Sequence, residues 1–137
     1  MITEDYVSFE TAKLLKEKGF NRDTNRYYIE GSVDKNPYYS PIRQNHNKRI
    51  TNNEFDIDID ITSSRISAPT LQMAMKWLRE TFEIHCQIDC PIVAFNWVYG
   101  IRDLDKDEWV TLRNMGDYDT HEEAAEAAIK YCLENLI

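Results

Sequence analysis

The last eighteen residues constrain the fold most, because they predict a helix with a defined start and one apolar face. Thr120 and Glu123 have the spacing of a capping box, in which each side chain accepts a hydrogen bond from the other residue's backbone N–H. The small and apolar residues that follow at helical spacing are Ala125, Ala128, Ile129, Cys132 and Leu136. We therefore expect a helix over 121–136 that buries this face against a sheet.

Start and stop signals predict two more helices. Ser8 is a good N-cap for a first helix, and Gly19 ends it in a Schellman-type stop. A second helix starts at Ser67 or Thr70, with Pro69 in its first turn. Both carry apolar residues at helical spacing, which indicates that each packs through one face.

Alternating and β-branched or aromatic runs predict the strands, which cover residues 26–30, 55–61, 92–102 and 108–114. The last two form a hairpin around a turn at 103–107, and Gly116 breaks the second arm. The order α-β-β-α-β-β-α favours a single α+β domain over 1–137, with an antiparallel sheet of three to five strands packed by helices. The second and third helices should bury Leu71, Met75, Leu78, Ala125, Ala128 and Cys132 on this sheet.

The composition restricts the class of protein. Apolar residues make up 42% of the chain, which is typical of a folded protein, and the net charge of −8 disfavours broad contact with nucleic acid or an anionic membrane. Three cysteines, an odd number, favour a reducing setting over a disulfide framework. No run approaches the roughly 20 apolar residues of a membrane-spanning helix. We therefore expect a soluble, cytoplasmic protein without a secretory signal or a membrane partner.

Three blocks carry a family resemblance: residues 6–20 (YVSFETAKLLKEKGF), 67–80 (SAPTLQMAMKWLRE) and 118–134 (YDTHEEAAEAAIKYCLE). They resemble a group of short uncharacterised proteins of anaerobic gut bacteria and their phages or mobile elements. The resemblance implies no known activity. Residues 32–66 lie in the part that varies most among these proteins, so the resemblance implies nothing about the role of residues 32–66.

The segment 32–53 is the best candidate binding surface. Its prolines and asparagines predict a long irregular loop that can include a short strand near Tyr39. Loops of this length are usually functional or disordered. The candidate contact residues are Tyr38, Tyr39, Arg43, His46, Lys48 and Arg49. Tyrosine rings stack on bases or other rings, and the cations attract phosphates or carboxylates. We expect this segment to be exposed. The simpler alternative is that the two tyrosines cover the sheet.

A metal site is not expected on the strand over 55–61. Asp56, Asp58 and Asp60 begin like a calcium loop, but Ile61 stands where that loop needs glycine and Ser67 where it needs glutamate. On a strand these carboxylates lie about 7 Å apart along one face, too far apart to enclose an ion unaided. A solvated strand face explains them.

His85, Cys86 and Cys90, with Cys132 elsewhere, contain the atoms for a zinc site or for a Cys–His nucleophilic pair. Only one short-spaced cluster exists, however, which favours packing roles for the thiols. The chain also lacks a Gly-rich phosphate loop, a nucleophile elbow and paired catalytic carboxylates. We therefore expect no cofactor and no metal, and we favour a protein that is not an enzyme.

The C-terminal third is acidic, with ten acids against three bases between Asp103 and Ile137. This balance suggests a nucleic-acid mimic that inhibits a basic partner, although most of the acids lie in a turn or at a helix start. The residues favour a small accessory protein that binds a protein partner, with nucleic acid a less favoured partner. The alternatives are an enzyme or zinc-binding protein with a Cys/His site, and the acidic mimic.

Overall fold

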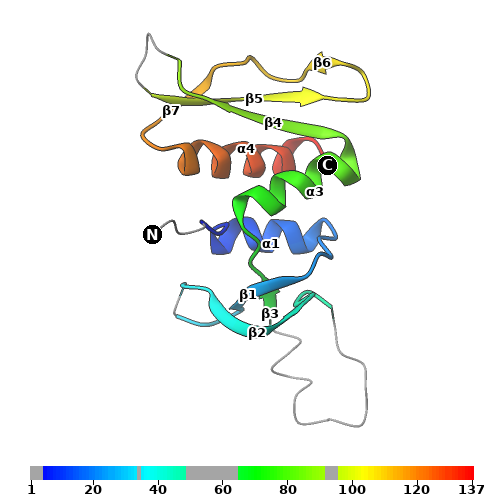
Figure 1. The fold of residues 1–137 in the computed structure, drawn as a ribbon, viewed down its shortest axis with the longest axis vertical. Helices are drawn as coiled ribbons and strands as arrows, with labels where there is room; N and C mark the ends of the chain where they lie inside the picture. The colour runs from blue at the N-terminus through cyan, green and yellow to red at the C-terminus, as the bar shows by residue number, and fades with distance from the viewer. Residues whose placement is uncertain (1–4, 34, 49–64, 92–95) are drawn as a thin grey trace. The chain divides into compact units, whose positions relative to one another are not determined.

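The computed structural model describes residues 5–33, 35–48, 65–91 and 96–137, which form two compact units (Figure 1). The N-terminal unit is Tyr6–Pro69, and the C-terminal unit is Thr70–Ile137 together with Met1–Asp5. The described residues form helices and two antiparallel sheets, so the predicted α+β class is confirmed. The strands are divided between these two sheets rather than joined in one. A single domain over residues 1–137 stays a prediction.

The N-terminal unit contains, in chain order, α1 (Phe9–Glu17), β1 (Thr24–Ile29), β2 (Tyr38–Gln44) and β3 (Arg65–Ser67). The strands form an antiparallel sheet in the order β2-β1-β3. Helix α1 starts as predicted, because the Ser8 hydroxyl accepts a hydrogen bond from the Thr11 N–H at 3.2 Å. It ends in the predicted Schellman motif: Gly19 has φ +92°, and the Phe20 N–H donates to the Leu15 carbonyl.

The core of the N-terminal unit forms between α1 and the sheet. Its fully or almost fully buried side chains are Val7, Ala12, Leu15, Phe20, Tyr28 and Ile66. Tyr28 fixes the chain before the helix, because its hydroxyl donates to the Val7 carbonyl at 2.6 Å while the Phe9 ring packs edge-on against its ring. Helix α1 therefore covers only one of the two faces of this sheet.

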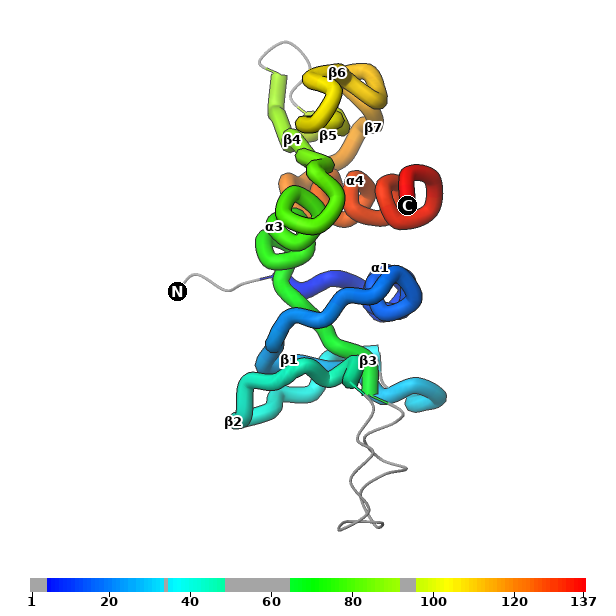
Figure 2. Tube along the Cα trace, turned by 90° about the vertical axis from the view of Figure 1, so that its right-hand side faces the viewer, coloured from blue at the N-terminus to red at the C-terminus, as the bar shows by residue number. Residues whose placement is uncertain are grey.

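The C-terminal unit contains α3 (Leu71–Phe82), β4 (Ile84–Asp89), β5 (Trp97–Asp103), β6 (Glu108–Trp109), β7 (Met115–Tyr118) and α4 (His121–Asn135). The sheet order is β4-β5-β6, and β7 also pairs with β5. Both helices lie on the same side of this sheet (Figure 2). The predicted helix–sheet packing is confirmed, because the side chains expected to be buried are all buried: Leu71, Met75, Leu78, Ala125, Ala128 and Cys132.

The starts of α3 and α4 are set by threonine caps. Thr70 Oγ1 accepts from the Met73 N–H, and Thr120 Oγ1 accepts from the Glu123 N–H, both at 3.1 Å. Of the two starts predicted for the second helix, Thr70 is therefore correct. Pro69 precedes this cap instead of occupying the first helical turn.

Several predicted strand boundaries are wrong. Residues 38–44 form strand β2, so the short strand expected near Tyr39 is present and is longer than predicted. Residues 84–89 form β4, where no strand was predicted. The second arm of the hairpin is just Glu108–Trp109, and Gly116 lies within β7 instead of breaking a strand. The predicted strand over 55–61 and the start of the one over 92–102 lie outside the described residues.

Candidate functional site

The most distinctive feature of the N-terminal unit is a large bulge in β2. Thr24 pairs with Gln44 and Arg26 pairs with Tyr39, so a single residue of β1 faces the four residues 40–43 of β2. Hydrogen bonds order the bulge: Asn25 Nδ2 donates to the carbonyl of Ser40 at 3.4 Å, and the hydroxyl of Ser40 donates to the carbonyl of residue 42 at 2.8 Å. Bulges of this kind redirect side chains and occur often beside functional sites.

The bulge exposes three side chains of different chemistry, Tyr39, Ile42 and Arg43, which we call the bulge surface. Ile42 is 67% exposed and Tyr39 is 59% exposed, and both rank among the exposed large hydrophobic residues of the chain. Arg43, the residue after Ile42, is also exposed. Tyrosine and arginine, together with tryptophan, are enriched among the residues that dominate the binding energy of protein interfaces.

The Tyr39 ring is held in place although more than half of the residue is exposed. The Arg26 guanidinium lies 4.9 Å from the centre of the Tyr39 ring and 5.6 Å from the centre of the Tyr6 ring. The cation is therefore attracted by two aromatic faces, which orders all three side chains. An exposed ring that is already ordered loses little conformational entropy when a partner covers it.

Tyr38 points to the opposite face of the sheet from Tyr39, because successive side chains of a strand alternate. There it belongs to a cluster around the Tyr27 ring, whose centre lies 5.8 Å from the Tyr38 ring, 4.8 Å from the His46 ring and 4.3 Å from the Arg65 guanidinium. The candidate tyrosines therefore belong to two different surfaces. Sequence reasoning missed Tyr27 and Arg65, which join the cluster through strand pairing.

His46 is 4% exposed, which corrects the expectation of an exposed ligand-binding histidine. Its Nε2 lies 3.2 Å from the Thr24 carbonyl oxygen, and its Nδ1 is buried without a hydrogen-bond partner. Burial, and then the nearby Arg65 guanidinium, lower the pKa of His46. This histidine therefore stabilises the turn after β2 in its neutral form.

The asparagines of the same turn also have structural roles. Asn47 Oδ1 accepts from the Ser67 N–H at 2.8 Å, and Asn47 Nδ2 donates to the Phe20 carbonyl at 3.0 Å. The side chain thus joins β3 to the end of the α1 region.

Lys48 is exposed, as expected, and Arg49 lies outside the described residues.

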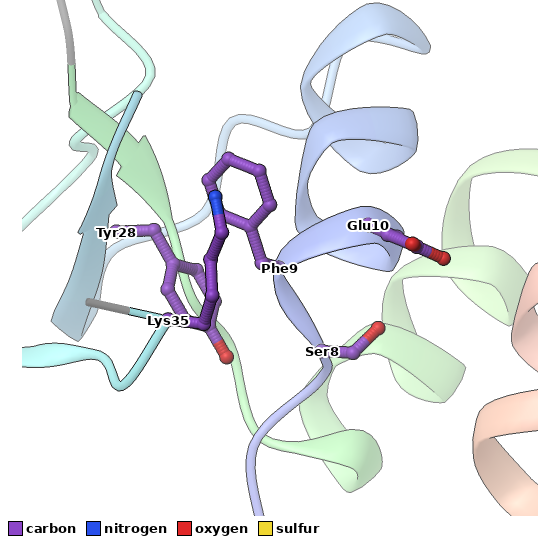
Figure 3. A pocket seen from close by; sticks show the side chains of 5 residues that line it. All are labelled: Ser8, Phe9, Glu10, Tyr28 and Lys35. Atoms are coloured by element: carbon purple, nitrogen blue, oxygen red, sulfur yellow. The ribbon is translucent and has the colours of Figure 1, made fainter. Parts of the chain in front are cut away.

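A shallow pocket of about 320 Å³ lies beside the start of α1 and is lined by Ser8, Phe9, Glu10, Tyr28 and Lys35 (Figure 3). The Lys35 side chain occupies part of it, with Nζ 4.0 Å from the centre of the Phe9 ring. The aromatic walls come from the helix and from β1. Sequence reasoning missed Lys35 as a partner of this ring, because nothing local in the sequence places it there.

The Cys/His cluster is divided between different places. Cys86 and Cys132 are both buried with their sulfur atoms 3.7 Å apart, and Cys90 is exposed. His85 precedes Cys86 on β4 and so points to the other face of the strand. Among the residues that the structure describes, no group of three or more His, Cys, Asp or Glu side chains is arranged to hold a metal ion.

Local interactions involve several of the acids that suggested a nucleic-acid mimic. Asp103 Oδ1 accepts from the N–H groups of Asp105 and Lys106, Asp107 forms an ion pair with Arg102, and Asp117 accepts from an asparagine side chain. These contacts order the ends of β5 and β7. The acidic-mimic hypothesis stays untested.

No family model, curated protein or solved structure matches this chain. In the described part of the chain, no helix is both long enough and apolar enough to cross a membrane.

Proposed function

We propose that this chain is a small accessory protein that acts by binding another protein through the bulge surface. The observation that carries the proposal is the exposure of Tyr39, Ile42 and Arg43 on an ordered bulge. An exposed aromatic ring, aliphatic side chain and guanidinium within five residues of one strand supply side-chain types that are found in protein interfaces. A cytoplasmic location and an association with phages or mobile elements belong to the same proposal, supported by the composition and by the resemblance of the helical blocks.

The chemistry of the bulge surface favours a partner with an apolar contact next to a carboxylate. In the described residues no ion pair involves Arg43, so its guanidinium can donate two parallel hydrogen bonds to a carboxylate of the partner. Ile42 and Tyr39 supply exposed apolar area on the same strand. Nucleic acid is a less favourable partner, because the whole chain carries a net charge of −8.

The experiment is an affinity capture from the source cells with three forms of the tagged protein, read out by quantitative mass spectrometry. The test variant combines Tyr39→Ala, Ile42→Ala and Arg43→Ala. The control is Leu112→Ala, because Leu112 is 72% exposed but belongs to the C-terminal unit. We expect a protein that is captured by the wild type and the control and lost with the test variant, while all three forms melt at the same temperature.

A photo-crosslinking amino acid at position 42 identifies the contact directly, and the cross-linked partner should be the protein lost in the capture. Equal capture by all three forms would refute the bulge surface as the binding site. Capture that is abolished by nuclease and falls steeply with salt would instead indicate nucleic acid as the partner.

A further inference from the structure

We propose that Cys86 and Cys132 form a redox modification site, at which a hydroperoxide converts two buried thiols into a disulfide between strand β4 and helix α4. The two sulfur atoms lie 3.7 Å apart, in contact, and both residues belong to the C-terminal unit. They are separated by 46 positions in the sequence, so their contact depends on the packing of α4 on β4. The site is independent of the proposed binding function.

The surroundings of the pair keep the thiols reduced until an oxidant reaches them. Cys132 is fully buried, Cys86 is 4% exposed, and fully buried Ile101 stands opposite Cys86 on the neighbouring strand. The hydrogen bond with Cys86, and then burial, raise the pKa of Cys132. Both effects disfavour the Cys132 thiolate, and we assign the first attack on the oxidant to the sulfur of Cys86, which is the less completely buried of the two.

The reaction balances in two steps. The Cys86 sulfur attacks the peroxide oxygen, the O–O bond breaks, and the thiol proton passes to the leaving oxygen, so that a sulfenic acid forms on Cys86 while the alcohol or water leaves. Cys132 then attacks the Cys86 sulfur, the S–S bond forms, and the sulfenic oxygen leaves as water with the thiol proton. The two thiols are oxidised by two electrons and the hydroperoxide is reduced. A small hydroperoxide suits this site, because the pair is buried.

The disulfide would tie β4 to α4 and restrict the unfolded chain, so the oxidised protein should melt at a higher temperature than the reduced one. The structure offers a clean way to measure this. Cys90, the third thiol, is exposed and would be oxidised first or would join two chains. Cys90→Ser removes this competing reaction at an exposed position and leaves just the buried pair.

The test treats reduced, folded Cys90→Ser protein with hydrogen peroxide, removes the peroxide with catalase, and labels remaining thiols with N-ethylmaleimide in denaturant. We expect a monomer that has lost two hydrogens, carries no label, and yields a peptide joining Cys86 to Cys132. Dithiothreitol should restore both thiols and the lower melting temperature. The double variant Cys86→Ser/Cys90→Ser, which keeps Cys132 alone, should form no intramolecular bridge.

Two labelled thiols after peroxide treatment would overturn the proposal, as would oxygen added to cysteine without a bridge, or a bridge between two chains. A bridge that forms only when the protein is first unfolded in urea would also overturn it, because the folded contact would then have no part in the reaction. If the double variant does not fold, the measurements on Cys90→Ser alone still decide the question.

Discussion

The Trp109 indole lies directly against Gly100, so that a Cβ atom added at residue 100 would come within 2.9 Å of Trp109 Cζ3. The same Cβ would approach the Cα of Arg113 to 3.0 Å. The Arg102 and Arg113 guanidiniums lie 5.6 and 5.0 Å from the Trp109 ring centre. Gly100 therefore provides the space in which a half-buried tryptophan packs on β5, near two cations.

Gly100→Ala should destabilise the C-terminal unit, because the added methyl group must displace the indole or the chain at Arg113. Overpacking of this kind costs about 1–3 kcal/mol of unfolding free energy. Chemical denaturation measures the loss, and Trp109 fluorescence reports whether the ring moves. In the double variant Gly100→Ala/Trp109→Ala the two effects should be less than additive, because the ring that meets the methyl group is gone. Strict additivity would contradict the contact.

Ala128→Leu tests the packing of α4 on the sheet. Ala128 is fully buried, whereas its neighbour Ala127 is half-buried and provides the matched control. The larger side chain at 128 should cost about 1–3 kcal/mol of unfolding free energy. Ala127→Leu adds the same atoms with a much smaller effect. Equal melting temperatures for the wild type and Ala128→Leu would mean that this face of the helix is assigned wrongly.

The helices could be predicted well because their signals are local. Ser8, Thr70 and Thr120 cap the helices that follow them, and each cap acts over just three residues of sequence. Strand β4 was missed although Ile84, Cys86 and Ile88 alternate with polar residues, because the segment was interpreted as a Cys/His cluster. The period of two was present and indicates a strand.

The candidate site was harder to predict, because its geometry depends on strand pairing. The pairing of Arg26 with Tyr39 determines that the Tyr39 ring packs on Arg26 at the bulge while Tyr38 packs on Tyr27. A change of register by one residue would exchange the two tyrosines between the faces of the sheet. Composition therefore identified residues with the right chemistry, but not which of them share a surface.

Tyr28→Phe tests the hydrogen bond that fixes the chain before α1. The Tyr28 hydroxyl donates to the Val7 carbonyl at 2.6 Å, and both residues are buried. Removing the hydroxyl leaves the carbonyl without this donor, which costs about 1–3 kcal/mol of unfolding free energy. Tyr27→Phe on the other face of the sheet is the control for loss of a hydroxyl, since Tyr27 contacts its neighbours through its ring. Equal losses for the two variants would show that the Val7 contact has no special role.

Stability should fall as the pH drops below about 6.5, the ordinary pKa of histidine. Burial, and then positive charge, lower the pKa of His46 and of His85 in the folded protein. Between the lowered pKa and 6.5 the unfolded chain binds more protons than the folded one, so unfolding free energy is lost as the pH falls through this window. For His46 the physical cause is local: a proton on Nδ1 would lie buried without an acceptor, near the Arg65 guanidinium.

His46→Gln should weaken this pH dependence, because glutamine can reach the Thr24 carbonyl with its amide but does not titrate. The measurement compares urea denaturation midpoints at about pH 7.5 and about pH 5, on either side of the ordinary histidine pKa. The midpoint of the wild type should fall more than that of His46→Gln, and the double variant His46→Gln/His85→Gln should fall least. Carboxylates that titrate at lower pH affect all three proteins alike, so the differences between them isolate the histidines. An unchanged shift in the double variant would show that other groups control the acid sensitivity.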